Sequence, residues 1–298
     1  MDTRPSVLAT LCTAKRVYIL LAIALCISIY AFSYNAVQDD ELIIRQHFVN
    51  LQKSNSTPQI PKIIHQVYAN GSIPKQWSDS SQSCRDKHPD WQHMLWTDDA
   101  ALQFLNEHYS WFVPVFKSYP YVIQRADAIR YFVLYHYGGV YIDLDIGCAK
   151  PLDDFLAFSA VLPKTYPIGV SNDFMATTRQ HAFFDQVLHA LKSHAHTFGS
   201  KFPTVMFSTG PMFVNFELAR YLRRSNQHTC TDKNAVCVIE QRWYENTPGS
   251  YLQHYDGSSW HGWDSDLLEY CGERKLFLFG WFLSLTFLLT LSRRRFRR

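Results

Sequence analysis

Residues 125–145 read RADAIRYFVLYHYGGVYIDLD, and this stretch decides the fold class. The segment from Gln124 to Tyr137 contains no glycine or proline and is followed by Gly138-Gly139, so it predicts a helix that ends at a glycine stop. The segment from Val140 to Ile146, directly after these glycines, is predicted to be a strand. A helix that leads directly into a strand is a building unit of an α/β sheet.

Segments upstream repeat this alternation of strand and helix. Ile60 to Tyr68 is a short β-branched run that ends at Asn70-Gly71, and Trp91 to Trp96 predicts a second strand. Thr97 provides the N-cap of a helix that runs to about His108. The pattern predicts an α/β fold with an open, mostly parallel sheet and helices on both faces. Ligands bind such sheets beyond the C-terminal ends of the strands.

Asp143 and Asp145 lie at the end of the predicted strand. Because side chains alternate along a strand, both carboxylates are expected on one face and Leu144 on the other. Two carboxylates on one face suit Mn²⁺ or Mg²⁺, hard cations that also bind diphosphate oxygens. In transfer from a nucleotide-sugar, such a cation neutralises charge on the departing diphosphate. The alternative is an aspartate pair that only closes a strand into a turn.

Asp127 and Arg130 are the second candidate pair. Their i, i+3 spacing places them on one helix face, where a carboxylate and a guanidinium can form a forked ion pair. The helix that carries them leads through Gly138-Gly139 into the aspartate strand. The alternative is a purely structural salt bridge.

Composition and the two ends of the chain limit which classes of protein this sequence can belong to. The 298 residues are 47% hydrophobic, enough to bury a substantial core. The formal charge of +3 is concentrated near the termini, so nucleic acid is not an expected partner. The uncharged run Val17 to Ser33 follows Lys15 and Arg16, which predicts a membrane span with a cytoplasmic N-terminus. A cleaved signal peptide is the alternative.

A second apolar run, Leu276 to Leu291, precedes five arginines among residues 293–298 and predicts another span, with a buried core helix as the alternative. The expected layout is a cytoplasmic N-terminus (1–16), a signal anchor (17–34), a stem (35–59), a lumenal domain (60–265), a C-terminal transmembrane helix (276–292) and a basic cytoplasmic tail (293–298). Sequons at Asn55 and Asn70 fit a lumenal domain. Of the five cysteines between about residues 35 and 275, Cys230 and Cys237 are the expected disulfide pair.

The order of these motifs resembles the glycosyltransferase family with the DXD sugar-binding motif. The similarity covers residues 60–265 and rests on the segments IPKIIHQVY (60–68), R-x-D-x-x-R-Y (125–131), GGVYIDLD (138–145) and Pro151-Leu152-Asp153, with Trp91 and Trp96 between the first two. Within that family the sequence is most similar to fungal inositol phosphorylceramide mannosyltransferases. That likeness rests on SNDFMAT (171–177), STGP (208–211) and the apolar C-terminal run.

The resemblance implies a GT-A type fold, which is Rossmann-like, and a retaining reaction. It makes Asp145 a direct metal ligand and lets Asp143 hold the ribose or the metal. It makes Asp127 and Arg130 the pair that binds hydroxyls of the donor sugar. No carboxylate nucleophile stands out, so the working hypothesis is a front-face mechanism steered by the leaving phosphate.

A polar cluster at 254–261, HYDGSSWH, resembles the H-x-x-G-x-x-W turn of related GT-A enzymes. His254 is the candidate third metal ligand, ahead of His261 and Asp256. Ser259 and Trp260 are candidate diphosphate contacts. The alternative is that a histidine happens to lie in a polar turn.

Smaller expectations concern the strand ends. His65 and Gln66 end the first predicted strand, where the nucleotide would bind, although a polar pair satisfied within the protein is an equal alternative. Asn172 and Asp173 fall where a sugar would approach, with a simple turn as the alternative. The tryptophans are expected in the core rather than as sugar platforms; they are Trp77, Trp91, Trp96 and Trp111.

The expected reaction is transfer of mannose from GDP-mannose to inositol phosphorylceramide, a membrane sphingolipid, with Mn²⁺ or Mg²⁺ in the Golgi lumen; the endoplasmic reticulum is the alternative location. The resemblance also suggests a separate multi-span regulatory subunit. One rival function is an α-mannosyltransferase acting on N-glycans. The other is a lumenal sugar- or cation-binding partner protein without turnover.

Overall fold

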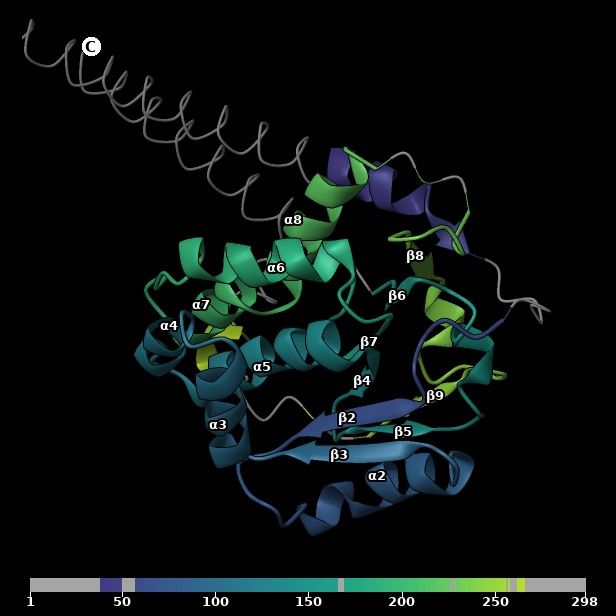
Figure 1. The fold of residues 1–298 in the computed structure, drawn as a ribbon, viewed down its shortest axis with the longest axis horizontal. Helices are drawn as coiled ribbons and strands as arrows, with labels where there is room; N and C mark the ends of the chain where they lie inside the picture. The colour runs from purple at the N-terminus through teal and green to yellow at the C-terminus, as the bar shows by residue number, and fades with distance from the viewer. Residues whose placement is uncertain are drawn as a thin grey trace, which may run out of the picture.

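The computed structural model describes residues 38–49, 57–165, 169–225, 227, 229–255, 257 and 262–265. A seven-stranded sheet has the order β1-β8-β6-β7-β4-β2-β3, and β5 pairs with β9 in a small second sheet (Figure 1). The strands are β1 (Phe48–Val49), β2 (Ile63–Val67), β3 (Gln92–Trp96), β4 (Gly139–Ile142), β5 (Ile146–Cys148), β6 (Ala160–Pro163), β7 (Phe174–Thr177), β8 (Val236–Ile239) and β9 (Leu252–His254).

Helices follow the strands along the chain. They are α2 (Lys75–Lys87), α3 (Asp98–His108), α4 (Val113–Ser118), α5 (Val122–Tyr137), α6 (Ala182–Ser193), α7 (Lys201–Ser208) and α8 (Pro211–Leu222), with 3₁₀ turns η1 (Asp153–Phe155) and η2 (Gln241–Trp243). Among them, α3, α5 and α8 match predicted segments. The Thr97 side chain accepts a hydrogen bond from the Ala100 N–H, which confirms the predicted cap of α3. Gly138 ends α5 with a φ of 67°, so the predicted glycine stop is also confirmed.

The large sheet is mostly parallel, as expected, because every strand in it except β7 runs in one direction. β7 pairs antiparallel with both β4 and β6. The start of β7 therefore lies beside the end of β4, with Ile142 opposite Phe174. This arrangement brings the segment before β7 to the edge of the sheet where the aspartates lie.

Two layers cover the sheet. Residues of α5, α6 and α8 pack with Tyr141 and Met175 on one face, whereas Val140, Ile142 and Phe174 face a second core that also contains Cys84 of α2. Figure 1 shows α5 and α6 on one side of β2 and β3 and α2 on the other. Alternate residues of one strand thus enter different cores, as expected for a sheet buried on both faces.

The predicted strand from Val140 to Ile146 is wrong in its extent. The structure ends β4 at Ile142, turns through residues 143–145, and begins β5 at Ile146 in the other sheet. Asp143 and Asp145 therefore lie in a turn between two sheets. The Ile146 N–H donates to the Asp143 carbonyl oxygen at 3.0 Å, which closes this turn.

Residues 38–49, placed in the stem by the sequence, pack against the domain. Ile44 is fully buried, and the Glu41 carboxylate accepts a hydrogen bond from the Gly169 N–H at 3.0 Å and pairs with Lys164 at 3.2 Å. β1 extends the sheet through parallel pairing of Phe48 with Val238. The folded domain therefore includes residues upstream of the predicted boundary at 60.

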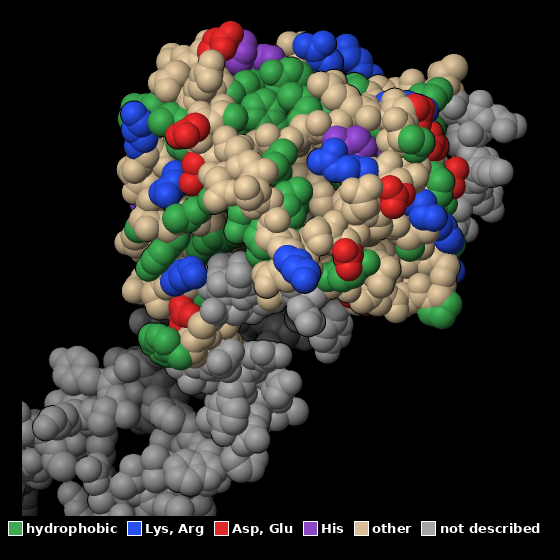
Figure 2. Space-filling view, turned by 90° about the horizontal axis from the view of Figure 1, so that it is seen from below, with side chains coloured by type: hydrophobic (Ala, Val, Ile, Leu, Met, Phe, Trp, Pro, Cys, Tyr) green, Lys and Arg blue, Asp and Glu red, His purple; other side chains and the backbone are tan. Residues whose placement is uncertain are grey.

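Within the described ranges, no helix combines the length and apolar character needed to cross a bilayer. The predicted spans at 17–34 and 276–292 lie outside those ranges, as do Asn55 and Cys271. Asn70 of the other sequon is exposed. On the face shown in Figure 2, described Lys and Arg side chains are interspersed with Asp and Glu and form no continuous basic area.

Candidate active site

A cavity of about 860 Å³ opens at the carboxyl edge of the sheet. Its walls come from the segments that follow β2 and β4, from the segment before β7, and from the first half of α5. Tyr244 and His254 contribute from the region around β9. The cavity therefore lies where the strand order predicts a ligand site.

Asp143 and Asp145 both line this cavity and are half-buried. Strand alternation predicted that both carboxylates face one side. They do face the same cavity, but the reason is the turn that follows β4. The Asp143 N–H donates to the Asp173 carbonyl oxygen at 2.8 Å, which extends the pairing of β4 with β7 by one residue. A third carboxylate, that of Asp173, thereby joins the same cavity.

Arg130 connects the helix to the aspartate turn. Its Nη2 lies 2.9 Å from Oδ1 of Asp127, and its Nη1 lies 3.3 Å from Oδ2 of Asp143. Nη1 also donates to the Asn172 carbonyl oxygen at 2.8 Å. The guanidinium lies over the ring of Tyr141 at 4.6 Å, a cation–π contact. The predicted ion pair with Asp127 is thus present, and Arg130 also fixes Asp143.

Asp127 is 4% exposed, and both of its carboxylate oxygens have partners. Oδ1 accepts from Arg130 and from Asn172 Nδ2 at 3.2 Å, and Oδ2 accepts from Thr209 Oγ1 at 3.0 Å. Tyr131 joins the network, because its hydroxyl accepts from Asn172 Nδ2 and donates to the Thr209 carbonyl oxygen. Asp127 therefore supports the floor of the cavity as well as lining it.

The two aspartates of the turn differ in their partners. Asp143 accepts from the Tyr141 hydroxyl at 2.5 Å and from Arg130, so both of its oxygens are engaged. No described side chain donates a hydrogen bond to the Asp145 carboxylate. Asp145 is therefore the more available of the two for an external ligand.

Burial and mutual repulsion make protonation of these carboxyl groups easier. Burial raises the pKa of Asp143 to about 7, and the negative charges of Asp145 and Asp173 add to the rise, against the lowering effect of Arg130. Burial and the charge of Asp173 also raise the pKa of Asp145. A cation placed between the carboxylates would relieve this repulsion, so the oxygen donors fit Mn²⁺ or Mg²⁺.

His254 lines the cavity at the end of β9, opposite Ile146 in the small sheet. Its Nε2 lies 3.0 Å from the Tyr244 carbonyl oxygen, which places the ring proton there and leaves Nδ1 as the possible ligand atom. Across the described residues, no three His, Cys, Asp or Glu side chains are already grouped as a metal site. The third-ligand role of His254 stays a prediction.

The segment after β9 passes directly over Asp145. The Tyr255 N–H donates to the Asp145 carbonyl oxygen at 2.8 Å. A Cβ added to Gly257 would lie 1.8 Å from Oδ2 of Asp145, so only glycine permits this approach. The predicted diphosphate contacts Ser259 and Trp260 lie outside the described residues, as do Asp256 and His261.

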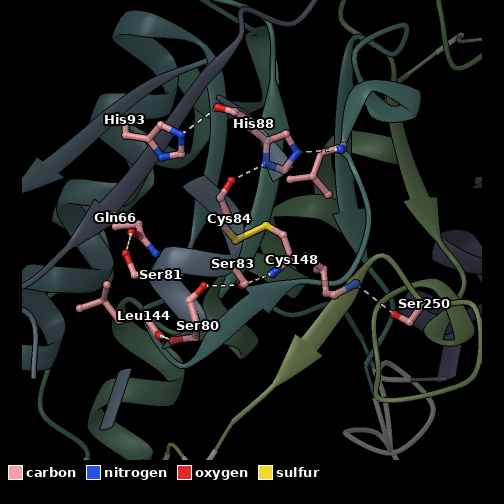
Figure 3. Close-up of a disulfide and its surroundings, with 12 residues drawn as sticks. Gln66, Ser80, Ser81, Ser83, Cys84, His88, His93, Leu144, Cys148 and Ser250 are labelled. Atoms are coloured by element: carbon pink, nitrogen blue, oxygen red, sulfur yellow. Dashed lines mark hydrogen bonds between the residues drawn. A yellow bond between two sulfur atoms is a disulfide. The ribbon is translucent and has the colours of Figure 1, made fainter. Parts of the chain in front are cut away.

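Helix α2 holds the aspartate turn from the other side (Figure 3). The Ser80 hydroxyl donates to the Leu144 carbonyl oxygen, and Ser83 Oγ accepts from the Cys148 N–H at 2.9 Å. A disulfide joins Cys84 of α2 to Cys148 of β5. Cys84 and Cys148 are 64 residues apart, and nothing in the sequence indicated that they pair. The predicted bond between Cys230 and Cys237 is confirmed.

His65 and Gln66 do not line the cavity, and their predicted contact with the nucleotide does not fit these positions. His65 is fully buried, with Nε2 at 2.9 Å from the Gly138 carbonyl oxygen and Nδ1 accepting from Trp96 Nε1. Gln66 points toward α2 and accepts from the Ser81 hydroxyl at 2.8 Å. The open alternative, a polar pair satisfied within the protein, describes His65 well.

Several lining residues were missed because their positions depend on the fold. Tyr68 and Trp77 form an edge-to-face pair in the cavity wall, although Trp77 was expected in the core. Trp91 and Trp96 are buried as predicted, whereas Trp111 is 44% exposed. Nothing in local sequence marks the remaining missed residues, which are Asp98, Tyr121, Tyr141, Lys201 and Tyr244.

Comparisons with known proteins now place the chain in a family. The family described as "Glycosyltransferase sugar-binding region containing DXD motif" matches residues 74–162, which contain Asp127, Arg130, Asp143 and Asp145. Mannosyl phosphorylinositol ceramide synthase CSH1 of Saccharomyces cerevisiae is 39% identical over 287 residues, which are 90% of this chain and 75% of that protein. The chain belongs to the inositol phosphoceramide mannosyltransferase family.

Another relative in this family has the higher identity but a shorter alignment. Inositol phosphoceramide mannosyltransferase 1 of Schizosaccharomyces pombe is 48% identical over 211 residues, 70% of this chain. The alignment spans only 64% of the relative's length. The solved PaToxG glycosyltransferase matches with a TM-score of 0.44 and 21% identity, covering 64% of this chain and 80% of that one, a likeness too low to carry an argument.

Proposed function

We propose that this chain transfers mannose from GDP-mannose to the inositol of inositol phosphorylceramide, in a retaining, metal-dependent reaction on a GT-A type domain. The names of its relatives in two yeasts support both the sugar and the acceptor. The observation that carries the proposal is the cavity itself, where the accessible carboxylate of Asp145 lies beside an Asp143 that Arg130 holds in place.

The donor diphosphate binds at the aspartate turn. Asp143 and Asp145 would hold Mn²⁺ or Mg²⁺, and His254 would add Nδ1 as the third protein ligand. When bound, the cation neutralises the charge that develops on the departing diphosphate. Arg130 orients Asp143 through direct contact, and its charge opposes the rise in the pKa of that carboxyl group that burial causes.

The donor sugar binds next to this turn, at the segment before β7. Asp173 supports this placement, since its Oδ1 is buried without a hydrogen-bond partner among the described residues while Oδ2 accepts from the Tyr244 hydroxyl at 2.5 Å. An orphaned carboxylate oxygen in a cavity suits a ligand hydroxyl. Asp127 and Asn172 position this wall through their mutual hydrogen bond. In a front-face reaction, the acceptor hydroxyl oxygen bonds to the anomeric carbon on the face from which the diphosphate leaves. The bond from that carbon to the diphosphate breaks, and the hydroxyl proton passes to the departing diphosphate.

Location and partner are also part of the proposal. Two spans, at 17–34 and 276–292, would hold the domain against the lumenal face of the Golgi membrane, close to a lipid headgroup. The disulfides support an oxidising compartment. A separate multi-span regulatory subunit is expected from the family resemblance.

The test uses microsomes from cells that express the full chain, supplied with labelled GDP-mannose and Mn²⁺. Label should enter an inositol-containing sphingolipid, and Asp145→Asn should reduce transfer at least about 100-fold, as loss of a principal electrostatic group does. The exposed aspartate Asp90, which pairs with Lys62, provides the matched control Asp90→Asn with unchanged transfer.

Two results would count against the proposal, and they can be told apart. Label that appears in glycoprotein but never in lipid would overturn the acceptor and favour the N-glycan enzyme. Undiminished transfer by Asp145→Asn would overturn the metal site. Folding of each variant is checked by its resistance to trypsin.

A further inference from the structure

Asp98 lines the cavity at the end remote from the segment before β7. It is the first residue of α3, directly after β3, and its side chain is exposed. Its N–H donates to the Ala69 carbonyl oxygen at 3.3 Å, and the Tyr68 N–H donates to the Trp96 carbonyl oxygen at 3.0 Å. These bonds continue the pairing of β2 with β3 beyond the strand ends and fix Asp98 beside the residues that follow β2.

The strand order sets out the polar groups of the cavity in a row. Along the sheet edge, Asp98 follows β3, Tyr68 follows β2, Asp143 follows β4, and Asp173 precedes β7. Neighbouring strands lie about 4.8 Å apart, so Asp98 and the aspartate turn are separated by two strand spacings, roughly 10 Å. If the diphosphate lies at the turn and the sugar at Asp173, the base of the nucleotide extends toward Asp98.

The wall between these two points suits an aromatic base. Tyr68 and Trp77 are in edge-to-face contact, with ring centroids 6.0 Å apart, and both line the cavity. Val67 and Ala69 add small apolar surface from the same segment. A flat, weakly polar base can contact such a wall with its face while its edge remains free to form hydrogen bonds.

We propose that Asp98 selects guanine as the base of the donor by accepting hydrogen bonds from its ring N1–H and its 2-amino group. This inference rests on the proposed nucleotide-sugar chemistry and adds the residue that reads the base. An ionised carboxylate only accepts hydrogen bonds, and its two oxygens match two adjacent donors. Guanine presents such a pair of donors on its Watson–Crick edge; uracil and adenine do not.

A structural role for Asp98 is the competing explanation, because an acidic residue in the first turn stabilises a helix. Asp99 provides the matched control. It is the next residue of the same turn and is also exposed, but it does not line the cavity. If Asp98 acts only by stabilising the helix, substitution of either aspartate should change nucleotide binding. If Asp98 selects the base, only its own substitution should do so.

The experiment measures dissociation constants of GDP, IDP and UDP by calorimetry on the purified full chain in detergent with Mn²⁺. IDP carries hypoxanthine, which keeps N1–H but lacks the 2-amino group. The wild type should bind GDP more tightly than IDP. Asp98→Asn should weaken the binding of GDP by about ten- to a hundred-fold. It should weaken the binding of IDP by a smaller factor and leave the dissociation constant of UDP unchanged. Asp99→Asn should leave all three constants unchanged.

Binding is measured in place of turnover because it tests base selection by Asp98 separately from the proposed transfer reaction. If the wild type binds GDP and Asp98→Asn keeps the wild-type ratio of GDP to IDP affinity, base selection by Asp98 is overturned and the proposed function survives. An equal loss in Asp99→Asn would also overturn it. If the wild type shows no preference for GDP over UDP, the guanine-nucleotide donor itself is overturned.

Discussion

Arg130 donates a hydrogen bond from Nη1 to Oδ2 of Asp143 at 3.3 Å, and this contact joins α5 to the aspartate turn. The same guanidinium pairs with Asp127 one helical turn earlier. One buried cation therefore serves two carboxylates, one that supports the cavity floor and one at the proposed metal site. The charge balance of the site depends on it.

Arg130→Met should destabilise the domain strongly, because it leaves Asp127 and Asp143 buried without their cation. Removing one partner of a buried ion pair costs about 3–5 kcal/mol. Urea unfolding of the purified protein measures the change. Arg45→Met is the control, since Arg45 is 61% exposed in its pair with Glu41 and its loss should have a much smaller effect. Equal effects would contradict the central role of Arg130.

Binding of Mn²⁺ should become tighter as the pH rises from about 5.5 to 7.5. The pKa of Asp143 is raised to about 7, so below that pH the group is largely protonated and a proton must leave before the cation binds. For one competing proton, affinity increases by up to about tenfold per pH unit and levels off above the pKa. Titration of free Mn²⁺ by electron paramagnetic resonance measures this, and Asp143→Asn should flatten the curve.

Loss of the disulfide between Cys84 and Cys148 should lower both stability and affinity for the cation. A native disulfide contributes about 2–4 kcal/mol, and this one links α2 to the strand that begins after the aspartate turn. The variant Cys84→Ala/Cys148→Ala is compared with Cys230→Ala/Cys237→Ala by thermal unfolding and Mn²⁺ binding. A similar loss of Mn²⁺ affinity in both variants would show that the first bond has no special effect on the turn.

Gly257→Ala should reduce transfer at least about tenfold while the domain stays folded, because a new Cβ at 1.8 Å from Asp145 Oδ2 must displace either the carboxylate or the segment above it. The matched control is Gly71→Ala, where an added Cβ meets no atom within 4 Å. Microsomal transfer and trypsin resistance are measured together. Normal transfer by Gly257→Ala would show that Asp145 tolerates the displacement.

Local sequence patterns were sufficient to predict much of the fold. The helix that carries Asp127 and Arg130, its glycine stop, the Thr97 cap and the i, i+3 ion pair all depend on residues close in sequence. The disulfide between Cys230 and Cys237 is likewise local. Such features follow from helix geometry, turn chemistry and short chain separation, so they can be inferred before the topology is known.

Features that depend on strand order could not be inferred. Asn172 and Asp173 were expected where a sugar would approach, and both line the cavity. The antiparallel direction of β7, which brings them to the aspartate turn, has no local signal in the sequence. The docking of residues 38–49 requires Phe48 to pair with Val238, far along the chain. From the sequence, the turn at 143–145 looked like part of a continuous strand because Leu144 is apolar. In the structure Leu144 is buried, but in the turn.

His65 shows why a polar residue in a strand is ambiguous. Its ring lies between the Gly138 carbonyl oxygen and the Trp96 N–H, so it joins the end of α5 to β3 inside the core. Burial lowers the pKa of His65 to about 4, which keeps it neutral.

The bond between Cys84 and Cys148 also bears on when the protein becomes active. The serine contacts from α2 to the turn are supplemented by this covalent link between the helix and β5. A newly synthesised chain holds both aspartates, but this covalent support of the turn forms only after two thiols have been oxidised. A chain with this bond reduced should therefore bind the cation more weakly than the oxidised chain.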